Sequence, residues 1–296
     1  MSKFNLIEQS HEVVALDFDA IDKIALVAHN CYQVKEKTHE ANINFVKQLI
    51  KNKHFAMLEH HVYCFKIIDE TFKDTLLILN NHFINIYKDK ISFSLRTAIE
   101  LFTSEDSLSH KVGAILVKHL SQEIIDMVNS SYETNLTREE KELLEVKDVT
   151  ALPLDERKIH MYVSVKLITN RGVTHELVRH RLCAFAQEST RYCNYTKDKF
   201  SNALTYIRPV DYEEHKETYD RYFECEAETY FKLIEEKSVP DKARSVLCNS
   251  LKASIYVTCN LNEWDHIFEL RTALNAHQDI RELLIPVKEE LAKYNS

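Results

Sequence analysis

Glycine is nearly absent from this chain, whose 296 residues include only Gly113 and Gly172. A dinucleotide-binding G-x-G-x-x-G turn and a phosphate-binding G-x-x-x-x-G-K-[ST] loop each need at least two closely spaced glycines. The two glycines lie far apart in the sequence, so both loops are excluded. Any nucleotide that binds here must therefore be held by side chains and by the N-termini of helices, and arginine is well suited to that task.

Long apolar runs and an excess of basic residues are also missing. No segment approaches the ~20 apolar residues that span a membrane, and the N-terminal sequence lacks the apolar core of a signal peptide. The seven cysteines are odd in number and scattered, which is typical of reduced thiols. We therefore expect a cytoplasmic protein with no membrane partner. The formal net charge of −8 argues against nucleic acid as a partner.

The composition is that of an ordinary globular protein, with 45% hydrophobic and 28% charged residues. No linker rich in proline, glycine or serine divides the chain. We therefore expect a single domain over residues 1–296, in which the acidic and weakly apolar segment 130–156 is a variable insertion. No repeat with a fixed period is visible.

Hydrophobic periodicity predicts a mixture of strands and helices, and hence a fold of the α/β (α+β) class. We expect strands over residues 59–68, 91–94, 160–169, 203–208 and 254–259. We expect helices over residues 18–33, 39–52, 70–88, 95–100, 105–130, 211–237, 260–271 and 276–293, with a helical turn over 243–247. Gly172 is expected to end the strand before it, and Thr174 to cap the short helix after it.

The densest group of functional side chains is the run RHRLCAFAQESTR, residues 179–191. It combines three guanidinium groups, an imidazole, an amide, a carboxylate and two hydroxyls within thirteen positions. Two arginines flank the histidine directly, so these charges cannot all lie on one solvated helical face. The run either binds an anion or is neutralised by acidic neighbours.

Zinc binding and nucleophilic catalysis by serine or cysteine are alternative chemistries for this region. His175 and His180 resemble a zinc-binding H-E-x-x-H pattern with one residue too many, so the imidazoles would diverge by about 140° on a helix. No metal site is therefore expected. Ser189 and Cys193 are conceivable nucleophiles, but Ser189 lacks a G-x-S-x-G elbow and Cys193 lies among aromatic residues that favour a packing role.

Two further arginines interrupt apolar helical runs, Arg244 in ARSVL and Arg271 in ELRTA. A salt bridge at a helix end would explain either one. An unpaired guanidinium is very costly to bury, however, so each must reach solvent, a carboxylate or a bound anion. A phosphate or an ionisable heterocycle would be a suitable partner.

The pattern R-H-R, seven residues, S-x-R resembles the signature of the flavin-dependent thymidylate synthases. Further segments look like that family in the expected order, so the resemblance spans about residues 20–290. These segments are HFAMLEHHVYCF, RGVTHELVRHR, QESTRY, ARSVL and NLNEWDHIFELRTALNAHQDIREL. The resemblance implies the thymidylate synthase-complementing-protein-like fold, with a curved, mostly antiparallel sheet flanked by helices.

The resemblance also implies an activity, namely the reductive methylation of dUMP to dTMP. Methylenetetrahydrofolate would donate the carbon, and FAD reduced by NADPH would donate the hydride. The family resemblance implies a homotetramer with FAD sites between subunits. Two alternatives stay open: a flavoprotein that methylates a different pyrimidine nucleotide, and a non-enzymatic protein that binds anions or nucleic acid.

Site residues follow from the same resemblance, position by position. The residues implied to bind FAD are His54, Glu59, Arg179, His180, Arg181, Gln187, Asn260, Asn262 and His266. Those implied to bind dUMP are Glu176, Arg179, Gln187, Glu188, Ser189, Thr190, Arg191, Arg244 and Arg271. Arg271 is the implied catalytic residue, because a guanidinium beside the uracil ring would favour its N3-deprotonated form.

Some positions depart from the commoner family pattern. Ala186 and Gln187 stand where some members have Asn and Glu, Glu176 where some have Gln, and His266 where some have Asn. We expect these differences to tune flavin affinity and to leave the reaction itself unchanged.

Overall fold

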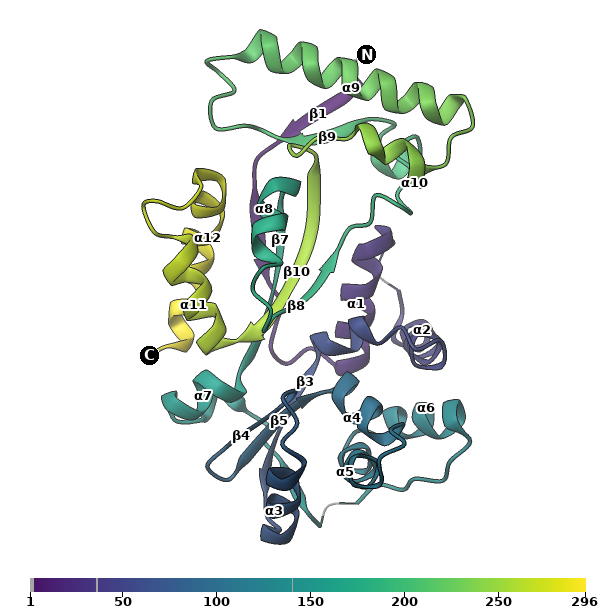
Figure 1. Cartoon of the computed structure of the whole chain (residues 1–296), viewed down its shortest axis with the longest axis vertical. Helices are drawn as coiled ribbons and strands as arrows, with labels where there is room; N and C mark the ends of the chain where they lie inside the picture. Colours follow the sequence, from purple (N-terminus) through teal and green to yellow (C-terminus); the bar gives the residue numbers. More distant parts are fainter. Residues whose placement is uncertain (1–2, 36, 140) are drawn as a thin grey trace.

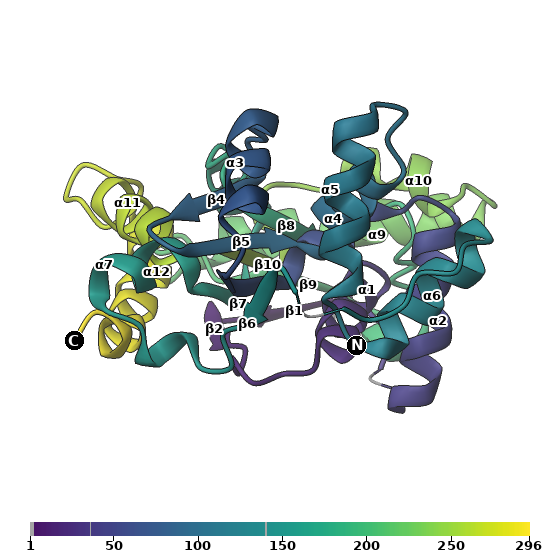
Figure 2. The same ribbon diagram turned by 90° about the horizontal axis from the view of Figure 1, so that it is seen from below.

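The computed structural model describes residues 3–35, 37–139 and 141–296 (Figure 1). Its strands form two four-stranded antiparallel sheets and one parallel pair. Helices surround both sheets, and α11 and α12 lie on the opposite side of the molecule from α1 and α2 (Figures 1 and 2). The predicted class, mixed α/β with antiparallel strands flanked by helices, is confirmed. The antiparallel strands are divided between two sheets.

The first sheet has the order β4-β5-β3-β6. Its strands are β3 (Val62–Ile67), β4 (Ile84–Tyr87), β5 (Lys90–Ser94) and β6 (Leu143–Glu145). The helices that share its core are α3 (Glu70–Leu79), α4 (Leu95–Phe102), α5 (Ser107–Lys118) and α6 (Gln122–Tyr132). Two helices that precede the sheet in sequence, α1 (Ala20–Tyr32) and α2 (His39–Lys51), join the same core and are followed by a 3-10 turn, Phe55–His60.

The second sheet has the order β2-β7-β10-β8. Its strands are β2 (Ser10–Val13), β7 (Tyr162–Asn170), β8 (Ala184–Gln187) and β10 (Lys252–Asn260). The helices beside it are α7 (Leu154–His160), α8 (Arg171–Leu177), α11 (Leu261–Arg271) and α12 (Gln278–Leu291). The Trp264 indole N–H donates to the Val163 carbonyl oxygen over 3.1 Å, which ties α11 to β7.

The parallel pair joins β1 (Phe4–Ile7) to β9 (Leu204–Ile207). It packs under the long helix α9 (Lys216–Glu235), with α10 (Pro240–Ala243) beside it (Figure 1). None of the helices in the described part of the chain is long and apolar enough to cross a membrane.

Helix ends in this chain are made without glycine. Asp19, Ser94 and Asn260 cap α1, α4 and α11, because each side chain accepts a hydrogen bond from a backbone N–H of the first turn. Left-handed C-cap positions, which usually favour glycine, are occupied by Gln33 after α1 and Asn80 after α3. The low glycine content therefore coexists with ordinary helix-end geometry.

Several expected boundaries were wrong. The helix predicted over 70–88 ends at Leu79, because Asn80 adopts the left-handed conformation and the chain then enters β4. The helix predicted over 105–130 is two helices, α5 and α6. Gly172 lies inside α8, whose cap is Asn170 and not Thr174.

The segment 130–156, which the sequence predicts to be a variable insertion, adds a strand to the first sheet. It contributes β6, which pairs with β3 at the edge of the first sheet, and it begins α7. Position 140, within this segment, and positions 1 and 2 lie outside the described residues. β6 was not predicted, because it has only three residues and lies in an acidic, weakly apolar segment.

Candidate functional site

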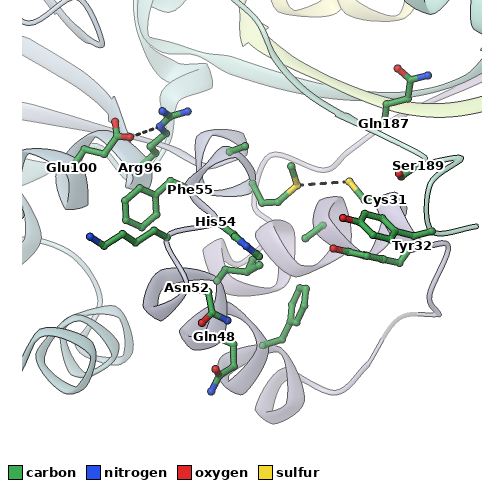
Figure 3. Close-up of a pocket in the computed structure, with 17 residues that line it drawn as sticks. Cys31, Tyr32, Gln48, Asn52, His54, Phe55, Arg96, Glu100, Gln187 and Ser189 are labelled. Carbon is green, nitrogen blue, oxygen red and sulfur yellow. Dashed lines mark hydrogen bonds and ion pairs between the residues drawn. The ribbon is translucent and has the colours of Figure 1, made fainter. Parts of the chain in front are cut away.

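A cavity of about 660 Å³, here called the lateral cavity, lies between α1, α2, the 3-10 turn and α4 (Figure 3). Three sequence-predicted residues line it, and these are His54, Gln187 and Ser189. Tyr32 and Tyr192 also line it, and their rings lie 5.1 Å apart, centroid to centroid. Its walls are otherwise largely apolar, so it suits a flat ring with polar groups at one edge.

A second cavity of about 560 Å³, here called the central cleft, lies between the two sheets. Four sequence-predicted residues line it, and these are Glu59, Arg181, Asn260 and Asn262. Asn260 and Asn262 come from the start of α11, whereas Arg181 comes from the turn between α8 and β8. The structure therefore brings together residues from distant parts of the chain.

Arg96 and Glu100 of α4 line both cavities. The Arg96 guanidinium donates to the Glu100 carboxylate over 2.8 Å and also pairs closely with Glu59. Burial raises the pKa of Glu59, and the nearby Arg96 charge opposes that rise. This ion triad forms the shared wall between the lateral cavity and the central cleft.

Arg271 lies at the C-terminal end of α11, the helix whose first residues line the central cleft. Its Nε donates to Nε2 of His180 over 3.1 Å, and its Nη1 donates to the Glu176 carboxylate over 3.0 Å. His180 Nδ1 lies 3.6 Å from a carboxylate oxygen of Glu263, which lines the central cleft. The His266 ring lies 5.9 Å from that of His180. The four predicted residues Glu176, His180, His266 and Arg271 thus form one cluster.

Electrostatics in this cluster favour neutral His180. Burial, followed by the positive charge of Arg271, lowers the pKa of His180 to about 4. Burial raises the pKa of Glu263. Arg271 therefore carries the permanent positive charge of the cluster, and Glu176 is the carboxylate that it contacts directly.

Arg191 and Arg244, the predicted phosphate-binding residues, meet at one carboxylate. The Nε atoms of Arg191 and Arg244 lie 3.3 and 3.7 Å from the same Asp241 oxygen. Both arginine side chains are exposed, and two guanidinium charges share one carboxylate. The pair therefore keeps an excess positive charge that a phosphate can use.

The remaining predicted residues lie elsewhere. Glu188 is buried, and its carboxylate accepts from Lys252 over 2.5 Å and from the Tyr195 hydroxyl over 3.3 Å. Thr190 is also buried, and it lines neither cavity. Arg179 is exposed and lies outside both cavities. The contacts with Lys252 and Tyr195 therefore explain why the Glu188 carboxylate can be buried without a ligand.

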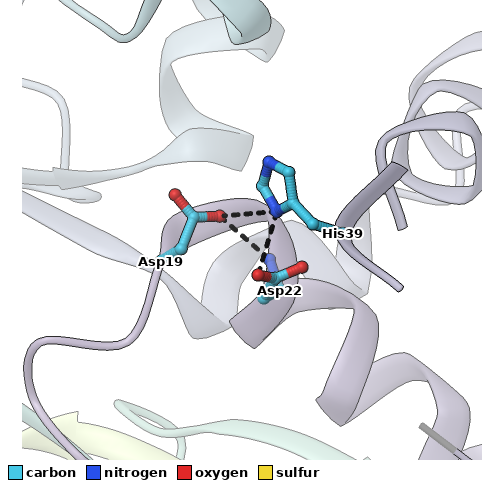
Figure 4. Close-up of side chains that lie close together, drawn as sticks. All are labelled: Asp19, Asp22 and His39. Atoms are coloured by element: carbon cyan, nitrogen blue, oxygen red, sulfur yellow. Dashed lines mark hydrogen bonds and ion pairs between the residues drawn. The ribbon is translucent and has the colours of Figure 1, made fainter. Parts of the chain in front are cut away.

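One further group has metal-ligand spacing among the described residues, namely Asp19, Asp22 and His39 (Figure 4). Asp19 already accepts backbone hydrogen bonds as the cap of α1. His39 Nδ1 lies 2.9 Å from Asp22, and this hydrogen bond raises the pKa of His39. The imidazole thus already contacts both carboxylates of the group.

Residues 117–294 match the family model described as thymidylate synthase complementing protein, which is more than half of the chain. The chain belongs to this family. Among curated members, it is 35% identical over 127 residues to the flavin-dependent thymidylate synthase of Pyrococcus furiosus, covering 42% of this chain and 51% of that protein. It is 30% identical over 116 residues to that of Geobacter sulfurreducens, covering 39% and 50%. The chain spans about half the length of the curated relatives it matches.

Two solved structures are similar to this family member. One is a UMP/dUMP methylase, PolB, from Streptomyces cacaoi with 5-Br dUMP, at a TM-score of 0.44 and 13% identity, covering 98% of this chain and 92% of that one. The other is thymidylate synthase X from Helicobacter pylori with FAD and dUMP, at a TM-score of 0.37 and 20% identity, covering 45% and 68%.

Sequence reasoning missed four residues of this family member's site, namely Arg96, Glu100, Asp241 and Glu263. Arg96 had a readable signal, because it interrupts the apolar run SLRTAIE as Arg271 interrupts its own helix. Glu263 has its partner His180 far away in the sequence. Glu100 and Asp241 have arginine partners four and three residues away, and such local pairs are common on ordinary helix surfaces.

Proposed function

We propose that this chain is a flavin-dependent thymidylate synthase that converts dUMP to dTMP, with methylenetetrahydrofolate as carbon donor and NADPH-reduced FAD as hydride source. Family membership and the names of the curated relatives support this reaction. The observation that carries the proposal is the division of the run 179–191 between adjoining cavities. Arg181 borders the central cleft, whereas Gln187 and Ser189 border the lateral cavity.

The residues of the central cleft fit a flavin. Apolar and polar side chains share its lining, in which Asn260, Asn262 and Glu59 offer hydrogen-bonding groups and Arg181 offers a positive charge. His54, which is also expected to bind FAD, lines the adjoining lateral cavity. When bound and reduced, the flavin supplies the hydride for the reaction. The protein's part is to hold the ring system and to exclude competing water.

The dUMP nucleotide is proposed to bind through its phosphate and sugar. Arg191 and Arg244 would bind the phosphate by displacing the carboxylate of Asp241, because a dianion attracts two guanidinium groups more strongly than one carboxylate does. Ser189 and Gln187 lie nearby in sequence and face the lateral cavity, where they would contact the sugar and ring.

Arg271 lines neither cavity of its own chain, so it is proposed to favour the N3-deprotonated uracil ring of a dUMP held by another subunit of the predicted homotetramer, with Glu176 holding its guanidinium in place. This electrostatic activation replaces a cysteine nucleophile. The chain's own thiols support that arrangement, because burial raises the pKa of Cys31 to about 11 and that of Cys193 to about 12. Both thiols are therefore protonated near neutral pH and are poor nucleophiles.

The experiment that tests the function is a single turnover without oxygen. The flavoprotein is reduced, mixed with dUMP and methylenetetrahydrofolate, and the nucleotide product is identified by mass spectrometry. We expect dTMP and oxidised flavin in equal amounts. Failure to bind any flavin at excess FAD would contradict the proposal, and methylation of another pyrimidine nucleotide in preference to dUMP would replace the substrate. The resemblance further implies a homotetramer, which remains a prediction.

A further inference from the structure

A third cavity, here called the Lys23 cavity, has a volume of about 390 Å³. Its lining combines residues from the start of α1, from the first residues of β3 and β7, and from the end of β6. Val62 and Tyr162 line both this cavity and the central cleft. None of the residues implied to bind FAD or dUMP lines it, however. The function proposed above therefore leaves the Lys23 cavity unexplained.

The ammonium group of Lys23 is buried without a counter-charge. The residue is only 6% exposed, and in the described part of the chain no hydrogen bond or ion pair joins its side chain to another residue. Burial lowers the pKa of Lys23 to about 8, so the group still carries its charge at neutral pH. An unpaired buried ammonium destabilises a fold, because its hydration is lost and nothing replaces it. A methionine would fill similar space without that cost, so packing does not account for the charge.

Two further polar atoms in this lining are buried and have no hydrogen-bond partner, namely Nδ1 of His61 and the hydroxyl oxygen of Tyr63. The two rings lie 4.6 Å apart, centroid to centroid. Burial, followed by the charge of Lys23, lowers the pKa of His61 to about 3, and burial raises the pKa of Tyr63. The imidazole is therefore neutral and the phenol keeps its proton. Buried polar atoms are nearly always hydrogen-bonded in folded proteins, so these groups call for a ligand that accepts hydrogen bonds.

The acidic groups of the lining limit the charge of that ligand. Asp19 accepts two backbone N–H groups as the cap of α1, Glu145 pairs with Lys147, and Asp17 is exposed. These three carboxylates repel a second negative charge in the cavity, whereas a single negative charge is neutralised by Lys23. The lining therefore favours a monoanion over a dianion such as hydrogen phosphate.

We propose that the Lys23 cavity binds a small monocarboxylate, whose oxygens accept hydrogen bonds from the ammonium of Lys23 and from the hydroxyl of Tyr63, with the imidazole of His61 as a further donor. A carboxylate has two acceptor oxygens and so can contact more than one donor at once. The rings of Phe18 and Tyr162 also line the cavity and suit an apolar remainder of the ligand. The assignment does not depend on the proposed function, and binding requires neither FAD nor dUMP.

The first test is isothermal titration of the full-length protein with benzoate, acetate and inorganic phosphate as separate probes. We expect benzoate to bind, because it joins one carboxylate to an apolar ring, and phosphate to bind more weakly than either carboxylate. Phosphate binding in preference to both carboxylates would overturn the ligand class. The absence of binding by both carboxylates would overturn the site, and neither result would bear on methylation of dUMP.

The second test uses variants of the two main donors. We expect Lys23→Met to weaken benzoate binding roughly tenfold or more, because a charge-assisted hydrogen bond is lost. Tyr63→Phe keeps the ring and removes only the hydroxyl, so it should weaken benzoate binding by a smaller factor. The matched control is Lys232→Met, because Lys232 is exposed in α9 and lines none of the three cavities. Wild-type benzoate affinity in Lys23→Met would overturn the assignment.

Urea unfolding separates a ligand-binding lysine from a structural one. Without a ligand the wild-type protein carries an unpaired buried ammonium, so Lys23→Met should raise the urea concentration at the midpoint of unfolding. Added benzoate should raise that midpoint in the wild type and leave it unchanged in Lys23→Met. A lower midpoint in Lys23→Met without benzoate would show that Lys23 stabilises the fold by itself, and it would overturn the proposal.

Discussion

Nε of Arg271 donates a hydrogen bond to Nε2 of His180 over 3.1 Å, and this contact fixes the tautomer of the imidazole. A guanidinium N–H only donates, so Nε2 accepts and the ring hydrogen resides on Nδ1. That hydrogen faces Glu263, whose carboxylate oxygen lies 3.6 Å from Nδ1. The chain Arg271, His180, Glu263 connects the proposed catalytic guanidinium to the wall of the central cleft.

Replacing Arg271 with glutamine should separate flavin binding from methyl transfer. Arg271 lines neither cavity, so we expect FAD affinity to stay near the wild-type value. Loss of the positive charge beside the uracil ring should lower the rate of dTMP formation on the order of 10²–10³-fold. Single-turnover kinetics with Arg208→Gln as control, a surface arginine paired with Glu8 and Glu213, checks this. Near-normal dTMP formation would remove Arg271 from the mechanism.

Acid should destabilise this protein through its buried histidines. Burial lowers the pKa of His180 to about 4, and those of His60 and His61 to about 3. In the unfolded chain a histidine titrates near about 6.5, so the unfolded state binds more protons below that pH. The free energy of unfolding should therefore be fully retained above pH ~6.5 and fall as the pH drops toward 4.

Urea unfolding at a series of pH values between 7.5 and 5 measures this dependence. His60→Gln removes one of the titrating groups, so the slope of the unfolding free energy below pH ~6.5 should become shallower. An unfolding free energy that stays constant from pH 7.5 to 5 in the wild type would show that these histidines titrate alike in the folded and unfolded states.

Local sequence patterns were sufficient to predict the helices that are stabilised by interactions within one or two turns. The helices α1, α2 and α11 were predicted within a few residues, because capping side chains and apolar periodicity act over one or two turns. The strands β2, β6 and β8 were missed, because each is short and is stabilised by a partner far away in the sequence. These short strands form only because a partner strand from a distant part of the chain pairs with them, and a local sequence pattern does not reveal such a partner.

The two antiparallel sheets are built alike, with β6, β3, β5 and β4 in the places of β2, β7, β10 and β8, and this likeness was invisible in the sequence for a related reason. β7 follows β3 by 100 positions at matching register, whereas β10 follows β5 by 166, so no fixed period exists. Equivalent positions also carry different side chains, as Arg96 and Asn262 do. In the site, the resemblance indicated the run 179–191 and Arg271, but the carboxylates that hold these arginines required the folded chain.

The carboxylate of Asp241 should compete with dUMP for Arg191 and Arg244. We expect Arg191→Ala to weaken dUMP binding by about 1.5–3 kcal/mol, the contribution of a charge-assisted hydrogen bond. Asp241→Asn keeps the shape of the side chain but removes its charge, so dUMP binding should become tighter. Isothermal titration with dUMP measures both effects. Unchanged affinity in Arg191→Ala, or weaker binding in Asp241→Asn, would contradict this arrangement.

Glu188 should act on stability and not on substrate affinity. Its side chain is 1% exposed and pairs with Lys252 over 2.5 Å. Glu188→Gln leaves a largely buried ammonium without its counter-charge, which should cost about 3–5 kcal/mol of unfolding free energy. The double variant with Lys252→Met should lose less than the sum of the two single variants. A large loss of dUMP affinity in Glu188→Gln, with unchanged stability, would instead support a direct role in binding.

Gly113 marks the closest approach between α4 and α5. A Cβ atom at this position would lie 2.0 Å from the Phe102 backbone nitrogen and 2.5 Å from the Leu101 carbonyl carbon, so the two helices would have to move apart. We therefore expect Gly113→Ala to destabilise the protein by about 1–3 kcal/mol, despite the better helix propensity of alanine. Gly172→Ala is the matched control, because its Cβ would meet only the Asn170 side-chain oxygen at 3.1 Å and then ordinary contacts. Equal unfolding free energies for both variants would show that α4 and α5 can separate at little cost.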